Sequence, residues 1–140
     1  MKVLFDTNVI LDVLLAREPQ AQVAARLLSL VDQGRLDGVI CATTVTTIHY
    51  LATRAVGPAL ARKHVGELLA MFDVACVDRE ALENALDLGF DDFEDAVLHE
   101  AAKAAEAAAI VTRNGKDFVA ASLPVFDPQE LLAAVLAATE

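Results

Sequence analysis

The chain has 140 residues, which fits one domain with a core large enough to need no disulfide or metal to hold it together. Hydrophobic residues make up 56%, yet no window reaches the ~18 uncharged apolar residues of a membrane span and the first residues lack the apolar run of a signal peptide, so a soluble cytoplasmic protein is expected. The formal net charge of −10 excludes broad adhesion to nucleic acid through Lys and Arg surfaces, suits a basic protein partner, and means that phosphate binding would need a divalent metal.

In chain order, short apolar runs typical of buried strands alternate with stretches whose apolar residues fall at helical spacing. The expected strands are Val3–Phe5, Val39–Ala42, Val74–Val77, Ala108–Val111 and, as a candidate fifth, Pro124–Phe126. The expected helices are Val9–Leu15, Gln20–Asp32, Thr43–Ala55, Pro58–Phe72, Arg79–Leu86, Asp92–Glu106 and a last one from Pro128. This alternation predicts a single α/β domain, residues 1–140, with a mainly parallel sheet.

Four acids crowd the start of the helix in Gly89–Ala102, namely Asp91, Asp92, Glu94 and Asp95. One interpretation is a helix cap, with Asp92 as the N-cap, because a helix N-terminus favours anions. The other is one wall of an acidic site, because Asp92 and Asp95 are three residues apart and share a helix face. Glu94 and Asp91 are expected to face solvent.

Two further acids follow apolar strands: Asp6 comes after the first and Asp117 lies in the loop after the fourth. In parallel sheets, sites form at the carboxyl ends of the strands, so both acids are expected at one edge. Several neighbouring carboxylates cannot all stay ionised without a cation between them. Oxygen ligands without His or Cys favour Mg²⁺ or Mn²⁺, which would activate a water and stabilise the leaving oxygen of a phosphodiester.

Three motifs in this order carry a family resemblance: FDTNVILD, DFEDAVLHEAA and IVTRNGKDF. Together they resemble the PIN-domain family of metal-dependent nucleases, which includes the VapC toxins of bacterial toxin–antitoxin pairs. The resemblance implies a three-layer α/β/α fold, dependence on Mg²⁺ or Mn²⁺ and endonucleolytic cleavage of RNA. It also implies a homodimer and silencing by a basic antitoxin peptide lying across the site.

The catalytic and metal-binding acids that this resemblance assigns are Asp6, Asp95 and Asp117, with Asp92 as a further metal ligand. Thr112 and Asn114 match loop residues of the family that orient ligands or bind phosphate. Arg113 lies beside the acidic loop and is interpreted either as a phosphate contact or as a solvated loop arginine.

One position departs from the family's pattern. Many members carry a glutamate in the helix after the second strand, where this chain has Thr47. If neither Asp92 nor Glu94 supplies the missing charge, the metal is held weakly and the activity is low. The alternative function is therefore an inactive PIN domain that binds RNA or a protein, although the three intact acids oppose it.

Four other polar side chains are given no direct part in the chemistry. Asp12 is placed at the surface or behind the metal ligands, and His99 on the helix surface or in the same supporting position. Cys41 and Cys76 lie in apolar runs and are expected to be reduced, buried thiols.

Overall fold

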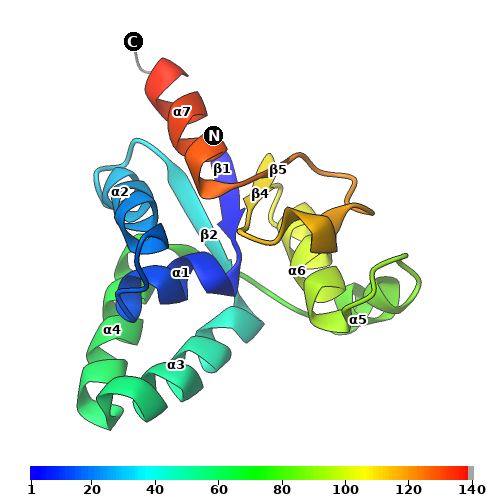
Figure 1. Cartoon of the computed structure of the whole chain (residues 1–140). Helices are drawn as coiled ribbons and strands as arrows, with labels where there is room; N and C mark the ends of the chain where they lie inside the picture. The colour runs from blue at the N-terminus through cyan, green and yellow to red at the C-terminus, as the bar shows by residue number, and fades with distance from the viewer. Residues whose placement is uncertain (139–140) are drawn as a thin grey trace.

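The first strand of the chain lies at the centre of the sheet in the computed structural model, which describes residues 1–138 (Figure 1). The strands are β1 (Lys2–Phe5), β2 (Asp37–Cys41), β3 (Asp73–Ala75), β4 (Ala109–Val111) and β5 (Val125–Phe126). Their order across the sheet is β3-β2-β1-β4-β5, and every neighbouring pair is parallel. Helices cover both faces, so the expected three-layer α/β/α architecture with a parallel sheet is confirmed.

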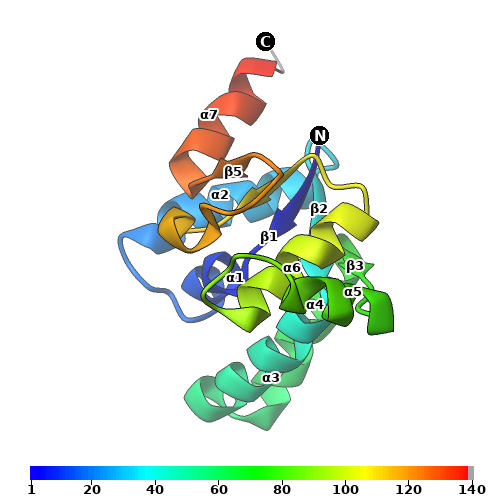
Figure 2. The ribbon, with the colours of Figure 1, turned by 90° about the vertical axis from the view of Figure 1, so that its right-hand side faces the viewer.

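The helices of the described chain form two unequal layers. They are α1 (Thr7–Leu14), α2 (Gln20–Asp32), α3 (Ala42–Val56), α4 (Pro58–Met71), α5 (Arg79–Leu86), α6 (Phe93–Ala104), α7 (Pro128–Ala138) and the short 3₁₀ helix η1 (Gly115–Phe118). Figure 2 shows α6 in front of the sheet with α5 beside it, and Figure 1 shows α1, α2 and α4 on the opposite side of the sheet. Within residues 1–138, no helix is long and apolar enough to cross a membrane.

Residues of β1 alternate between the two layers. Val3 and Phe5 pack with the cluster that includes α1, α2 and α7, and Leu4 packs on the opposite face with α6. All three side chains are fully buried. An unbroken apolar run is what a parallel strand covered on both faces requires, and it brings the next residue, Asp6, to the end of the central strand.

Two ambiguous segments of the sequence adopt the predicted secondary structure. The threonine-rich stretch predicted as a helix is helical, as α3, and the candidate fifth strand exists, as β5. The prediction that Cys76 is buried is wrong: β3 is an edge strand whose pairing ends at Ala75, so Cys76 follows it at the surface, whereas Cys41 is buried. Both thiols are free.

Candidate active site

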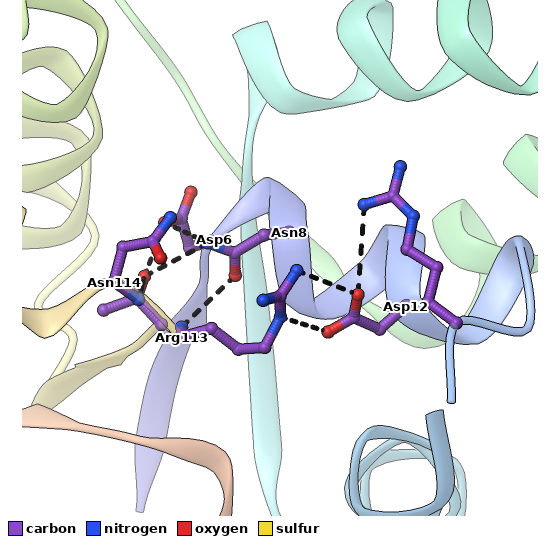
Figure 3. Close-up of polar contacts among 7 residues, drawn as sticks. Asp6, Asn8, Asp12, Arg113 and Asn114 are labelled. Carbon is purple, nitrogen blue, oxygen red and sulfur yellow. Dashed lines mark hydrogen bonds and ion pairs between the residues drawn. The ribbon is translucent and has the colours of Figure 1, made fainter. Parts of the chain in front are cut away.

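Asp6 is held in a fixed position at the carboxyl end of β1. It is 7% exposed and caps α1, accepting the backbone N–H of Thr7 at 2.7 Å. Its Oδ2 accepts the Thr112 hydroxyl at 2.7 Å and the Asn8 amide at 3.3 Å (Figure 3). Donors from the start of α1 and from the end of β4 therefore converge on one carboxylate.

Thr112 joins the ends of the two central strands. It is fully buried directly after β4, and its hydroxyl, besides donating to Asp6, accepts the backbone N–H of Asn114 at 3.0 Å. Asn8 also donates to this hydroxyl at 3.4 Å. These bonds fix the loop that leads to η1, in which Asp117 is exposed. Asn8 was not singled out from the sequence, although its place two residues after Asp6 is typical of such a supporting amide.

The first turn of α6 presents the other acids. Asp92 is the N-cap and its Oδ1 accepts the backbone N–H groups of Glu94 at 2.8 Å and of Asp95 at 3.3 Å. The cap interpretation of Asp92 is thus confirmed. Asp92 is exposed and Asp95 is half-buried, so both carboxylates can still reach solvent or a ligand.

Mutual repulsion shows that acids from the two sides lie near one another. Burial raises the pKa of Asp6 from its ordinary 3.8, although the hydrogen bonds from Thr112 and Thr7 oppose the rise. The charges of Asp117 and Asp92 raise this pKa further. Asp6 is therefore within the electrostatic reach of acids from α6 and from η1.

Among the acids of the site, Asp95 has a strongly raised pKa. Burial raises its pKa to about 7, and the charges of Asp6, Asp92, Asp117 and Glu94 add to the rise. The structure thus brings together the four acids that the sequence singled out, and it adds Glu94. We call these five residues the acidic cluster.

Glu94 was expected to face solvent, with compensation for the charge missing at Thr47 as the alternative. It is exposed, but its pKa is raised by partial burial and by the charges of Asp92 and Asp6. The charge of Glu94 therefore interacts with the other acids of the cluster even though its side chain reaches water. Its position between two site acids on the first helical turn was the signal that could have indicated this.

The chemistry of these donors fits a hydrated divalent cation. The polar atoms are carboxylate and hydroxyl oxygens, which suit Mg²⁺ or Mn²⁺. In the described part of the chain, no three acidic, histidine or cysteine side chains converge closely enough to enclose a metal. Mg²⁺ is commonly held by one or two carboxylates together with waters and substrate phosphates, and the open cluster matches that mode rather than a closed protein cage.

The helix α3 approaches the site with hydroxyl groups instead of a carboxylate. The Thr47 hydroxyl donates to the carbonyl of Thr43 at 3.1 Å, inside its own helix. The buried Thr44 lies 3.0 Å from the Thr7 hydroxyl, oxygen to oxygen. Nothing in α3 therefore replaces the glutamate that many family members have.

Arg113 turns its side chain away from the cluster. Its backbone N–H donates to Asn8 Oδ1 at 3.3 Å, while its guanidinium donates to Asp12 through Nε and, at 3.1 Å, through Nη2 (Figure 3). Arg17 adds a second ion pair to Asp12 at 3.9 Å. The surface interpretation of Asp12 is wrong: it is fully buried. Arginine partners make this burial tolerable, and the one that bonds through two nitrogens, Arg113, is 101 residues away in the sequence.

His99 is likewise not a surface residue. It is almost fully buried, its Nδ1 lies 2.9 Å from Glu100 Oε2, and its Nε2 accepts the backbone N–H of Ser122 at 3.0 Å. Because Nε2 accepts, the neutral ring carries its proton on Nδ1 and donates it to Glu100. His99 thereby fastens the loop between η1 and β5 to α6.

A three-layer α/β domain with acids gathered at the ends of its central parallel strands is the class of protein that this fold and site define. The chain belongs to the PIN-domain family, whose model matches residues 2–116. No curated protein sequence matches the chain.

Solved structures of similar fold include several toxin–antitoxin proteins. VapBC2 of Rickettsia felis, bound to a DNA fragment from its promoter, is 13% identical over 91% of this chain and 98% of that chain, with a TM-score of 0.71. A toxin–antitoxin complex from Klebsiella pneumoniae is 21% identical over 90% and 97%, with a TM-score of 0.67. VapC20 of Mycobacterium tuberculosis, described as a sarcin–ricin-loop-cleaving toxin, is 16% identical over 77% and 86%, with a TM-score of 0.62. At such identities the likeness shows the fold.

Proposed function

We propose that this protein is a metal-dependent endoribonuclease that hydrolyses RNA phosphodiester bonds and acts as the toxin of a toxin–antitoxin pair. The observation that carries the proposal is the fixed, buried Asp6 beside carboxylates that help to raise the pKa of Asp95 to about 7. Such crowding destabilises a protein unless a cation neutralises it. Membership of the PIN-domain family and the fold shared with VapC20, described as cleaving the sarcin–ricin loop, support RNA as the substrate.

Asp6 and Asp95 are the proposed principal ligands of Mg²⁺ or Mn²⁺, with Asp117 and Asp92 completing its surroundings. When bound, the metal would lower the pKa of an attacking water and stabilise the leaving oxygen. The chain's own contribution is position: Thr112 and the start of α1 hold Asp6 in one orientation, and the Asp92 cap orients the first turn of α6.

The loop after β4 supplies the proposed contact to phosphate. The backbone of Asn114 is fixed by Thr112, and its side chain is exposed, so the amide is available to a phosphate oxygen. Arg113 is the second proposed phosphate contact, because Asp12 engages only one edge of its guanidinium. Since the side chain points away from the acidic cluster, this contact would be to a phosphate next to the cleaved one.

The proposed partners follow from charge and exposed apolar surface. A basic antitoxin peptide would satisfy the acidic cluster and occlude it, and the net charge of −10 favours such a partner. Tyr50, Leu60 and Leu69 on α3 and α4 are exposed and provide surface for a second copy of the chain, so a homodimer in the cytoplasm is proposed.

A binding module without hydrolysis is the second candidate function. Thr47 offers no carboxylate, and a closed group of three ligands is absent from residues 1–138. Both observations would suit a PIN domain that holds RNA or a protein without cutting it. The repulsion among the acids around Asp95 opposes this second candidate, because binding RNA or a protein without metal does not require neighbouring carboxylates.

Incubating the purified protein with structured and single-stranded RNA in Mg²⁺, Mn²⁺ or EDTA tests the proposal. Cleavage should require metal and should disappear in Asp6→Asn and in Asp95→Asn. Asp91→Asn is the matched control, because Asp91 is an exposed acid beside the same helix start and outside the cluster. Cleavage that survives both site substitutions would overturn the mechanism. RNA binding that ignores metal, without cleavage by the unaltered protein, would establish the binding module instead.

A further inference from the structure

A small pocket lies beside Arg113, where three separate segments of the chain meet. Its volume is about 250 Å³. The residues that line it are Pro19, Gln20, Val23, Arg113, Asp127, Pro128 and Gln129. They come from the beginnings of α2 and α7 and from the loop that carries the proposed phosphate contacts. None of the acids of the cluster lines this pocket, so it is distinct from the proposed metal site.

Arg113 is held in this pocket wall by a buried carboxylate. Asp12 is fully buried and accepts from both Nε and Nη2 of the guanidinium. Two parallel bonds of this kind fix the plane of an arginine and not only its position. The Arg113 side chain remains 30% exposed and lines the pocket, so an occupant of the pocket can contact it.

The pocket is linked to the acidic cluster by one side chain. Asn8 accepts the backbone N–H of Arg113 through Oδ1 and donates to Asp6 through Nδ2. A polynucleotide whose phosphate lies at Asp6 would therefore bring a neighbouring nucleotide toward Arg113. The occupant of the pocket is thus expected to be continuous with the substrate of the cluster.

We propose that this pocket binds one unpaired base of the RNA, next to the cleaved bond, with its ring stacked on the guanidinium of Arg113. The inference rests on the proposed function. Bases of single-stranded RNA are commonly splayed out and stacked on aromatic side chains or arginine planes. The volume is below the ~300–1,000 Å³ of sites for whole small molecules, which suits one base.

The walls favour a base over a phosphate. Pro19, Val23 and Pro128 present apolar surface that suits a flat ring. Asp127 is an exposed carboxylate that would repel a phosphate, and the backbone N–H of Glu130 is already satisfied by Asp127 Oδ1 at 2.8 Å. The beginning of α7 is therefore a poor place for an anion.

An abasic scan of a cleaved single-stranded RNA tests the inference. Removing the base at one position flanking the cut should lower kcat/KM of the unaltered protein about 10-fold or more, as loss of a stacking contact does, and other positions should matter less. Val23→Phe fills the pocket. Arg113→Lys keeps the positive charge but removes the planar guanidinium on which the base would stack. Both variants should cleave intact and abasic RNA at equal, reduced rates.

Arg26→Lys is the matched control, because Arg26 lies on α2 and lines a different pocket. Its abasic profile should match that of the unaltered protein, and thermal melting establishes that every variant is folded. A flat abasic profile in a protein that does cleave RNA would overturn the base pocket and leave the nuclease proposal standing. An unchanged profile in Val23→Phe, together with lost binding of a basic antitoxin peptide, would make the pocket a protein-docking site.

A binding measurement in Mg²⁺, with RNA made non-cleavable at the cut bond, tests the pocket without turnover. RNA carrying 2-aminopurine at the sensitive position, or at each position in turn, should lose fluorescence on binding to the unaltered protein and keep it with Val23→Phe or Arg113→Lys. RNA that binds with no fluorescence change at any position would overturn the inference. Absence of both RNA binding and cleavage would overturn the proposed function and the pocket together.

Discussion

The two sides of the acidic cluster are built differently. On the strand side, Asp6 is nearly buried and bonded to Thr7, Thr112 and Asn8. On the side of α6, Asp95 is half-buried, and burial together with the charges of four nearby acids raises its pKa to about 7. Asp6 is fixed by hydrogen bonds before any ligand arrives, whereas on the other side the Asp92 cap orients the first turn of α6.

This difference assigns a separate physical role to each side. A fixed carboxylate sets where a ligand binds without reorganisation. A crowded, partly solvated carboxylate stores repulsion that a cation would relieve. Substitutions on the strand side should therefore weaken the structure and the binding, whereas removing the charge of Asp95 on the α6 side should relieve repulsion in the metal-free protein.

The largest effect on stability is expected at Asp12, on the helix α1 that follows Asp6. Asp12→Ala should lower the free energy of unfolding by about 2–3 kcal/mol, somewhat less than the ~3–5 kcal/mol typical of a broken buried pair, because Arg113 and Arg17 can turn to water. Urea denaturation measures this change, with Asp91→Ala as an exposed control. An effect of a few tenths of a kcal/mol would mean that the pair does not fasten the loop.

Thr112→Val should be next in size, because it keeps the shape but removes the hydroxyl that Asp6 accepts. Supporting groups of this kind typically contribute 10–100-fold to metal affinity or activity. Mn²⁺ affinity and the cleavage rate should both fall by about that factor, and Thr112→Ser should restore them. A Thr112→Val protein with normal Mn²⁺ affinity would show that Asp6 needs no such support.

Asp95→Asn should change the pH dependence of stability on the α6 side. Because the pKa of Asp95 is raised to about 7, the folded protein keeps a proton that the unfolded chain loses near pH 4. Stability of the metal-free protein should therefore fall as pH rises from about 4 to about 7 and then level off. Asp95→Asn should show a smaller decline, because the pKa values of Asp6 and Glu94 are raised as well. It should be more stable at pH 8 by about 1 kcal/mol or less, since the group is partly solvated.

Thermal melting in EDTA across this pH range measures the effect. Adding Mg²⁺ at pH 8 should raise the melting temperature of the unaltered protein more than that of Asp95→Asn. Identical pH profiles for the two proteins would show that the repulsion is not concentrated at Asp95.

Substitutions of Asp92 should have small effects that separate its role as a helix cap from its proposed role as a metal ligand. Asp92→Ala should cost about 1 kcal/mol through loss of the helix cap. Asp92→Ser keeps a capping oxygen and removes the charge, so it should retain stability and lose only Mn²⁺ affinity. Calorimetric Mn²⁺ titration beside urea denaturation measures both, and equal metal affinity in all three proteins would leave Asp92 as a cap alone.

Sequence reasoning located the elements that bear a local pattern. The apolar run of β1 and the helical spacing in Gln20–Asp32 predicted those elements, and Asp92 carried a recognisable cap signal. The positions of Asp6 and Asp117 after strands were enough to expect them at one edge of a parallel sheet.

Residues whose environment depends on distant partners could not be placed in this way. Asp12 is buried because Arg113 reaches it from a loop 101 residues away, and no local pattern encodes that meeting. His99 lies in a run of consecutive buried residues on α6, where the usual contrast between an inner and an outer helix face is absent. Glu94 shows a different limit, since an exposed side chain can still share the field of a site.

The central position of β1 in the sheet has a consequence for folding during synthesis. Asp6 follows β1, but the hydroxyl that fixes it belongs to Thr112, 106 residues later, and β4 can pair with β1 only after that segment has been synthesised. Contacts this distant in sequence form late, because the chain must first close a long loop. A nascent chain emerging from the ribosome therefore carries its acids unassembled until the segment with Thr112 has been synthesised.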